Sequence, residues 1–231
     1  DSDNDGIPDL IEALGADADN DGKIDAFTDT NSDGIADNYI LFSALLITGV
    51  DVTPVDGRSD NWPNKNKDRD FRPNAYDMDS DGDGIVDVIE AGLPDADLNG
   101  IVDGVVIGSG NGWSPTVSGL AALNLRNTDA IGSHDYLDID SDEDGIPDNI
   151  EGMSTAGYAL PTLTDADGDG LMLPYDNLPA AFGGGGIFVY DHDADATPDY
   201  RDLDTDADGL IDRVEGNDYN LNGIADDNVT P

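Results

Sequence analysis

Cysteine is absent from the 231-residue sequence, and basic residues are scarce, with 9 Lys and Arg against 52 Asp and Glu. Without cysteine the chain has no disulfide framework, no Cys-containing metal site and no thiol chemistry. Its two histidines stand in no Ser-His-Asp setting, so general acid–base catalysis has few candidates and we do not expect an enzyme. The net charge of −43 would repel nucleic acid and anionic membranes and favours cations as partners.

Long hydrophobic runs are also missing. The apolar run Tyr39–Val50 (YILFSALLITGV) is too short to span a bilayer, so we expect no membrane insertion and interpret it as a buried strand or docking segment. Further short strands or turns of helix are predicted at Val102–Ile107, Gly119–Leu125 and Ile187–Tyr190. The sequence predicts no long amphipathic helix and no regular sheet.

An acidic block dominates what is present. Its clearest copy, Asp138 to Gly152 (DIDSDEDGIPDNIEG), places five aspartates within eleven residues. Like charges so close repel one another, so we expect the chain to fold there only around a bound cation. Oxygen ligands indicate a hard cation, and the alternating Asp, the following Gly and Glu at the twelfth position favour calcium. Gly145 is expected in a conformation open mainly to glycine.

The block occurs four times, beginning at Asp1, Asp77, Asp138 and Asp202, and this repetition is stronger support than any single copy. The side-chain ligands predicted from the four blocks are Asp1, Asp3, Asp5, Asp9 and Glu12; Asp77, Asp79, Asp81, Asp83, Asp87 and Glu90; Asp138, Asp140, Asp142, Asp144, Asp148 and Glu151; and Asp202, Asp204, Asp206, Asp208, Asp212 and Glu215.

Each block is expected to end in a helix of one or two turns, closed by a glycine. The aliphatic pairs that would turn toward a small apolar patch are Ile7 and Ile11, Ile85 and Ile89, Ile146 and Ile150, and Leu210 and Val214.

Looser motifs lie between the blocks, with an incomplete echo at Asp68 and Asp70. Their predicted ligands are Asp17, Asp19, Asp21 and Asp25; Asp29, Asn31, Asp33 and Asp37; Asp95, Asp97, Asn99 and Asp103; Asp165, Asp167 and Asp169; Asp191, Asp193, Asp195 and Asp199; and Asp218, Asn220, Asn222 and Asp226. Together the motifs predict about ten calcium ions.

These DxDxDG arrays resemble thrombospondin type 3 repeats, in particular the cysteine-free versions of bacterial secreted and surface proteins. The phrases HDYLDIDSDEDGIPDNIEG and TPDYRDLDTDADGLID carry the resemblance, which covers the chain except Tyr39–Asn64 and Gly104–Asn127. It implies calcium-wrapped, rod-like structure in which each loop also supplies one main-chain carbonyl. By that comparison the carbonyl ligands are Ile7, Ile85, Ile146 and Leu210.

We therefore expect a mostly irregular, metal-stabilised elongated repeat array with short helices after the DxDxDG loops and a few short β-strands. The array would cover residues 1–231, with sub-units at about 1–76, 77–137, 138–201 and 202–231. Both ends, at Asp1 and at Asp226, resemble half of an internal join, which predicts head-to-tail contacts between copies or successive segments.

Two functions agree with this reading. The first is an extracellular or cell-surface structural protein, a calcium-stiffened stalk or filament subunit that forms homo-oligomers, since such sites fill at about 0.1 to 1 mM calcium. The alternative is a calcium-dependent adhesin that binds glycan or protein through the inserts 39–64 and 104–127.

Overall fold

The computed structural model describes residues 1–12, 17–19, 22–23, 25–28, 30, 66–70, 72–104, 114–118, 120, 123–153, 157–162, 164–179, 181–209 and 211–215. Within these ranges every helix is three or four residues long and no strand is formed. The Ile187–Tyr190 segment, predicted as a strand or helical turn, is neither. The predicted segment Tyr39–Val50 and the whole insert 39–64 lie outside the described residues, as does half of 104–127.

A one-turn α-helix follows each of the four acidic blocks. These helices are α1 (Asp9–Glu12), α3 (Asp87–Glu90), α5 (Asp148–Glu151) and α6 (Asp212–Glu215). In α3 the carbonyl of Val86 accepts hydrogen bonds from the backbone N–H groups of Ile89 (2.9 Å) and Glu90 (3.3 Å). Gly92 then adopts φ +74°, a left-handed conformation that ends the helix as the sequence predicted.

A 3-10 turn precedes three of these blocks. The turns are η1 (Asn74–Tyr76), η2 (Asp135–Leu137) and η3 (Asp199–Arg201), and each is flanked by extended residues. An additional one-turn helix, α4 (Pro115–Ser118), lies outside the blocks. The chain therefore alternates 3-10 turn, loop and one-turn helix instead of forming layers.

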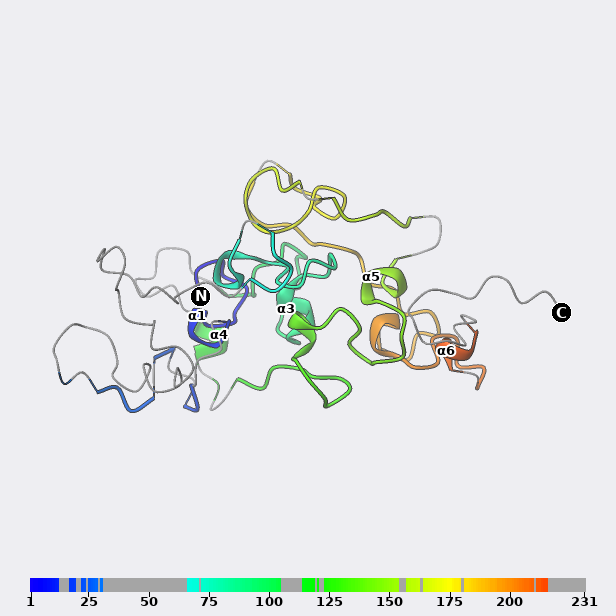
Figure 1. Cartoon of the computed structure of the whole chain (residues 1–231), viewed down its shortest axis with the longest axis horizontal. Coiled ribbons are helices and arrows are strands. Elements are labelled where there is room, and N and C mark those ends of the chain that lie inside the picture. Colours follow the sequence, from blue (N-terminus) through cyan, green and yellow to red (C-terminus); the bar gives the residue numbers. More distant parts are fainter. Residues whose placement is uncertain are drawn as a thin grey trace.

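Successive blocks pack against one another in chain order. Helix α1 contacts η1, α3 contacts η2, and α5 contacts η3. Figure 1 shows α1, α3, α5 and α6 following one another along the longest axis of the molecule. Helices α1, α3 and α5 are therefore each supported by the 3-10 turn that precedes the next block, since an isolated helix of this length is unstable.

Among the described residues, the buried hydrophobic side chains form two clusters around the first and second blocks. One gathers Ile7, Ala91, Tyr136 and Leu137. The larger one gathers Ile85, Val86, Val88, Val102, Val117, Leu171, Met172, Tyr175, Ile187 and Tyr200. Residues 164–187, which we assigned to the third sub-unit, thus pack on the second block, where the N–H of Met78 donates to the carbonyl of Asp169 (2.9 Å).

The aliphatic pairs were expected to pack their side chains into an apolar patch, and only some of them do. Ile7 and Ile85 are 0% and 1% exposed, and Ile11 and Ile89 pack against the clusters. For Ile150 the prediction is wrong, because neither cluster reaches it and its side chain is 42% exposed. The Leu210 and Val214 side chains lie outside the described residues.

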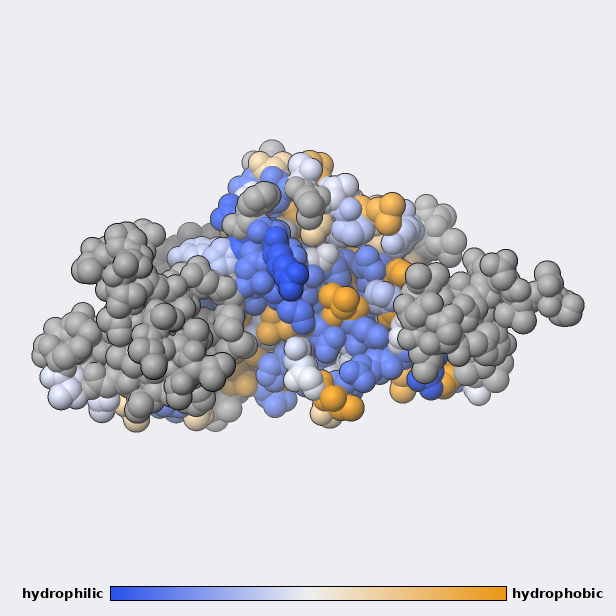
Figure 2. Space-filling view, in the orientation of Figure 1, coloured by the Kyte–Doolittle hydropathy of each residue, from blue (hydrophilic) through white to orange (hydrophobic). Residues whose placement is uncertain are grey.

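The visible surface is mainly hydrophilic. On the face in Figure 2 the hydrophobic residues among those described form separate patches within a hydrophilic field. In the described ranges, none of the helices has the length and hydrophobicity to cross a membrane. A chain with so little apolar burial needs another source of stability.

Candidate metal centres

The acidic loops share one backbone shape. We number each loop from its first ligand, so that loop residue 6 is the glycine of DxDxDG and loop residue 12 is the Glu of the main blocks. Loop residue 6 has φ +97° at Gly6, +99° at Gly84, +98° at Gly145, +101° at Gly170 and +95° at Gly209. These angles favour glycine, which confirms the prediction made for Gly145.

The loop aspartates hold the loop's own backbone through hydrogen bonds. In the third block the Asp144 carboxylate accepts the Ile146 N–H (2.7 Å), and Asp142 accepts the Asp144 N–H (3.1 Å). Asp148, at loop residue 9, accepts both the N–H (2.8 Å) and the hydroxyl (2.6 Å) of Ser141. These bonds fix the side chains in place before any ligand binds.

The other carboxylate oxygens are buried without a partner. In the second block the acidic side chains are at most 7% exposed, and each has at least one oxygen without a hydrogen-bond partner among the described residues. Across the described residues, the acids with at least one buried oxygen that has no hydrogen-bond partner are Asp3, Asp5 and Glu12; Asp77, Asp79, Asp81, Asp83, Asp87 and Glu90; Asp129, Asp140, Asp142, Asp144 and Glu151; and Asp167 and Asp176. Buried unpaired carboxylates are costly, so these atoms fit a bound cation.

Burial and mutual repulsion raise the pKa values of these acids. Burial is the main cause at Asp3 and Asp81, where it raises the pKa to about 7. At Glu151 burial, followed by the nearby carboxylates, raises the pKa to about 11. A divalent cation would reverse this effect by favouring the ionised forms.

Carboxylate oxygens from several acids gather within 4.8 Å of one another and could hold metal ions. Such groups include Asp1, Asp3 and Asp5; Asp17, Asp19 and Asp25; Asp68, Asp70 and Asp77; Asp79, Asp81 and Asp83; and Asp5, Glu12 and Asp87. The last group joins two blocks that are far apart in the sequence, which the sequence reading did not predict.

Several looser motifs show the same internal hydrogen bonds. The Asp95 carboxylate accepts the Gly100 N–H (2.9 Å), and Asp103 accepts the Ala96 N–H (3.0 Å). Asp199 accepts the His192 N–H (2.8 Å), and Asp165 accepts the Gly170 N–H (3.2 Å).

The remaining predicted residues fall into two groups. Among the described residues, Asp212 begins α6, and the others lie in loops: Asp97, Asp191, Asp193, Asp195, Asp202, Asp204, Asp206 and Asp208. Asp21, Asp29, Asn31, Asp33, Asp37, Leu210, Asp218, Asn220, Asn222, Asp226 and the Glu215 side chain lie outside them.

One further loop was missed in the sequence, and another was recognised only as the incomplete echo at Asp68 and Asp70. In Asn66–Asp77 the Lys67 N–H donates to Asn74 (3.0 Å), and in Asn127–Asp138 the Thr128 N–H donates to Asp135 (2.7 Å). These bonds match the one from Ser141 to Asp148, and each loop starts 13 residues before a main loop (79 − 66 = 13; 140 − 127 = 13). Asp77 and Asp138 are thus the twelfth residues of these loops.

Asp176 was also missed. It is the twelfth residue of the loop that begins at Asp165, and its side chain is 7% exposed with one unpartnered oxygen. Burial raises its pKa, and the carboxylates of Asp167 and Asp165 raise it further. The spacing of twelve residues was the available signal, but only Glu was sought at that position.

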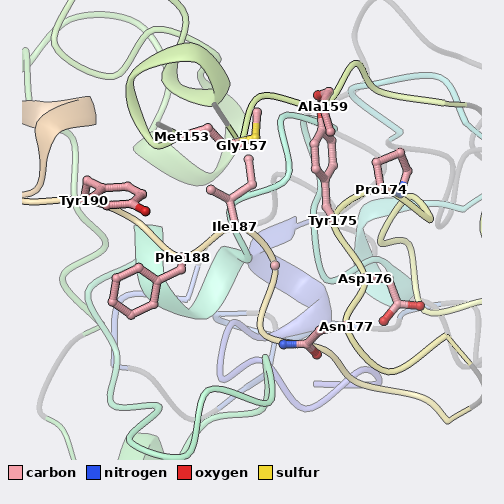
Figure 3. Close-up of a pocket in the computed structure, with 11 residues that line it drawn as sticks. Met153, Gly157, Ala159, Pro174, Tyr175, Asp176, Asn177, Ile187, Phe188 and Tyr190 are labelled. Carbon is pink, nitrogen blue, oxygen red and sulfur yellow. The ribbon is translucent and has the colours of Figure 1, made fainter. Parts of the chain in front are cut away.

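An open pocket of about 450 Å³ lies beside this loop. Figure 3 shows Ile187, Phe188 and Tyr190 from one segment and Tyr175 from another around it, with Asp176 and Asn177 at its edge. Phe188 and Tyr190 meet edge to face, with ring centres 5.9 Å apart, and are 70% and 45% exposed.

No family model, curated protein or solved structure matches the chain.

Proposed function

We propose that this protein is an extracellular calcium-binding structural protein, a calcium-stiffened stalk or filament subunit. The observation that carries the proposal is the set of buried carboxylate oxygens without partners, concentrated in loops of one repeated shape. Net charge alone would not require this, because a solvated acidic chain has no reason to bury its carboxylates.

Calcium is favoured over other metals by the donor atoms. The clusters are built from carboxylates, and hard oxygen donors suit calcium, whereas zinc and copper sites use imidazole or thiolate. The resemblance to thrombospondin type 3 repeats adds a main-chain carbonyl from loop residue 7, and about ten ions would bind in total. Calcium loops of this kind in extracellular modules fill at extracellular calcium concentrations, which supports a location outside the cell or on its surface.

A structural role is supported by how the blocks pack. Each contacts the next, as in a repeat array, and the apolar clusters are small, so bound ions would replace part of the missing core. Contacts of this heterologous kind need not close, and they suit head-to-tail assembly of copies into filaments. Electron microscopy in about 1 mM calcium tests this assembly, with filaments expected and isolated particles contradicting it.

Calcium binding itself is tested by equilibrium dialysis of the whole chain against a range of free calcium. Several ions per chain are expected, and displacement of calcium by an excess of magnesium should be weak, since magnesium demands a smaller and stricter octahedral site. A chain that binds no calcium at about 1 mM would refute the proposal.

A calcium-dependent adhesin is the second candidate. Of the inserts first considered for this role, all of 39–64 and half of 104–127 lie outside the described residues. The open pocket favours the role independently, because exposed aromatic rings beside polar side chains suit sugars. A glycan array with Phe188→Ala as the matched variant tests it. Binding that is absent, or that this substitution leaves unchanged, would remove this candidate.

A further inference from the structure

Three carboxylates from two distant blocks meet at one point of the chain. Asp5 and Glu12 belong to the first block and Asp87 to the second, and their ligand oxygens lie within 4.8 Å of one another. All three side chains are 0% exposed. Repulsion between these carboxylates therefore acts between the first block and the second.

The oxygens that remain unpartnered are those not used within the loops. Asp5 accepts the Ile7 N–H (2.7 Å) and Asp87 accepts the Ser80 N–H (2.8 Å), each through Oδ1. The Oδ2 atoms of both residues and both carboxylate oxygens of Glu12 are buried without a hydrogen-bond partner. The three acids that come together here therefore carry four buried acceptor atoms without a donor among the described residues, which suits a cation better than a hydrogen-bonded network.

The next two blocks share the packing of the first junction but not its unpartnered oxygens. Both oxygens of Glu90 are buried without a partner, whereas both oxygens of Asp148, loop residue 9 of the next block, accept hydrogen bonds from Ser141. The packing of α1, α3 and α5 on the following 3-10 turns repeats in the same order.

We propose that the junction of Asp5, Glu12 and Asp87 is a divalent-cation site that ties the first two blocks together, an inference that rests on the calcium-binding function proposed above. The site takes loop residues 5 and 12 from the first block and loop residue 9 from the second. Asp5 belongs to the loop group with Asp1 and Asp3 as well as to the junction group, so it connects the two sites. The ion at a junction fixes how one block sits on the next, which an ion inside a loop does not do.

A double-mutant cycle tests the shared site. Glu12→Gln and Asp87→Asn each remove one carboxylate from opposite sides of the junction with little change in shape. Calcium bound to the full-length chain is counted at a fixed free concentration of about 1 mM, where extracellular sites are filled. Because both changes remove the same junction ion, the double variant should lose one ion fewer than the sum of the two single losses.

Asp103→Asn supplies the matched control. Asp103 is also loop residue 9 and accepts the N–H of its loop residue 2, Ala96, but it lies outside the group formed with Asp5 and Glu12. Losses from Glu12→Gln and Asp103→Asn should therefore add.

Three outcomes are distinguishable. Additive losses for Glu12→Gln with Asp87→Asn, in a wild-type chain that binds calcium, would overturn the junction while leaving the proposed function intact. A wild-type chain without bound calcium would overturn both. If Glu12→Gln fails to fold at saturating calcium, Glu12→Asp, which keeps the charge but shortens its reach, takes its place in the same cycle.

Discussion

The metal-free chain should be expanded at about pH 8 and become compact either on adding calcium or on lowering the pH. The perturbation is removal of divalent cations by a chelator followed by dialysis. Folding then requires carboxylates to be ionised in buried positions, with the carboxylates of the neighbouring loop residues close by. Small-angle scattering reports the resulting size directly.

The magnitude follows from Asp3 and Asp81. Burial raises the pKa of each from 3.8 to about 7, so keeping one of them ionised in the folded chain costs about 4 kcal/mol. Two such groups cost about 8 kcal/mol, which equals the whole stability of many domains. The other acids of the second block, whose pKa values are raised further, add to this cost.

The direction of the pH effect follows from the sign of the shifts. An acid with a raised pKa binds its proton more tightly in the folded chain, so the metal-free fold gains stability as the pH falls. The gain begins near the folded pKa, about 8 for Asp148, and is complete below the unfolded values near 4. In the calcium-loaded chain the sign is opposite, because protons compete with the ion for the same oxygens.

The expected radius of gyration is about 50 Å for the expanded chain, against a lower limit of about 17 Å for a compact one. Sodium chloride at matched ionic strength is the control, because it screens repulsion without filling the loops. A metal-free chain that keeps its compact radius at about pH 8 would show that the buried carboxylates are tolerated without cations.

Three further predictions concern single residues. Gly145→Ala should lower the free energy of unfolding by about 1 to 3 kcal/mol through its positive φ alone, since a Cβ there meets no atom within 4 Å. Gly84→Ala should lower it more, because its Cβ would lie 2.6 Å from the Tyr175 ring. Thermal unfolding in calcium compares the two variants, and equal losses of stability would contradict this. Asp176→Asn should lower the number of bound calcium ions, measured by dialysis, and an unchanged count would remove Asp176 from the ligands. Terbium bound in place of calcium should be sensitised by Tyr200, which is fully buried and lies near the predicted ligand Glu90. Burial raises the pKa of Tyr200 most, and the Glu90 carboxylate raises it further. Tyr200→Phe should therefore reduce terbium emission more than Tyr76→Phe, whose side chain is 44% exposed, and equal reductions would refute the placement.

Local geometry was predictable from the sequence. Proline or an aliphatic residue before Asp, and Glu three residues later, indicated the one-turn helices, and the position after the third ligand indicated a left-handed glycine. Both features depend on residues within one loop.

The missed loops have a physical explanation. Loop residue 5 is Ile131 in the loop that begins at Asn127, and in the Asn66 loop residue 6 is Phe71, so neither fits DxDxDG. They are defined instead by the hydrogen bond between loop residues 2 and 9, which many side chains permit. The junction could not be predicted from the sequence, because Asp5 and Asp87 come together only through the packing of separate blocks.

Backbone strain links the loops to their ions. Loop residue 4 also has positive φ, and most examples are not glycine: Asn4, Arg69, Leu98, Ala130, Glu143, Ala194 and Ala207. A non-glycine residue in this region costs about 1 to 2 kcal/mol, so seven of them cost on the order of 10 kcal/mol. Two small apolar clusters have little surplus to offset that cost together with buried charge.

An ion bound by loop residues 1, 3 and 5 would stabilise the very turn that the strain opposes, so ion binding and loop folding become one equilibrium. Asp5 belongs both to its loop group and to the junction with Asp87, which couples this equilibrium to the next block. Filling one loop then orders a ligand of its neighbour, and the coupling must act equally in both directions. In such an array calcium loading is cooperative along the chain, and stiffness appears over a narrow range of calcium concentration instead of block by block.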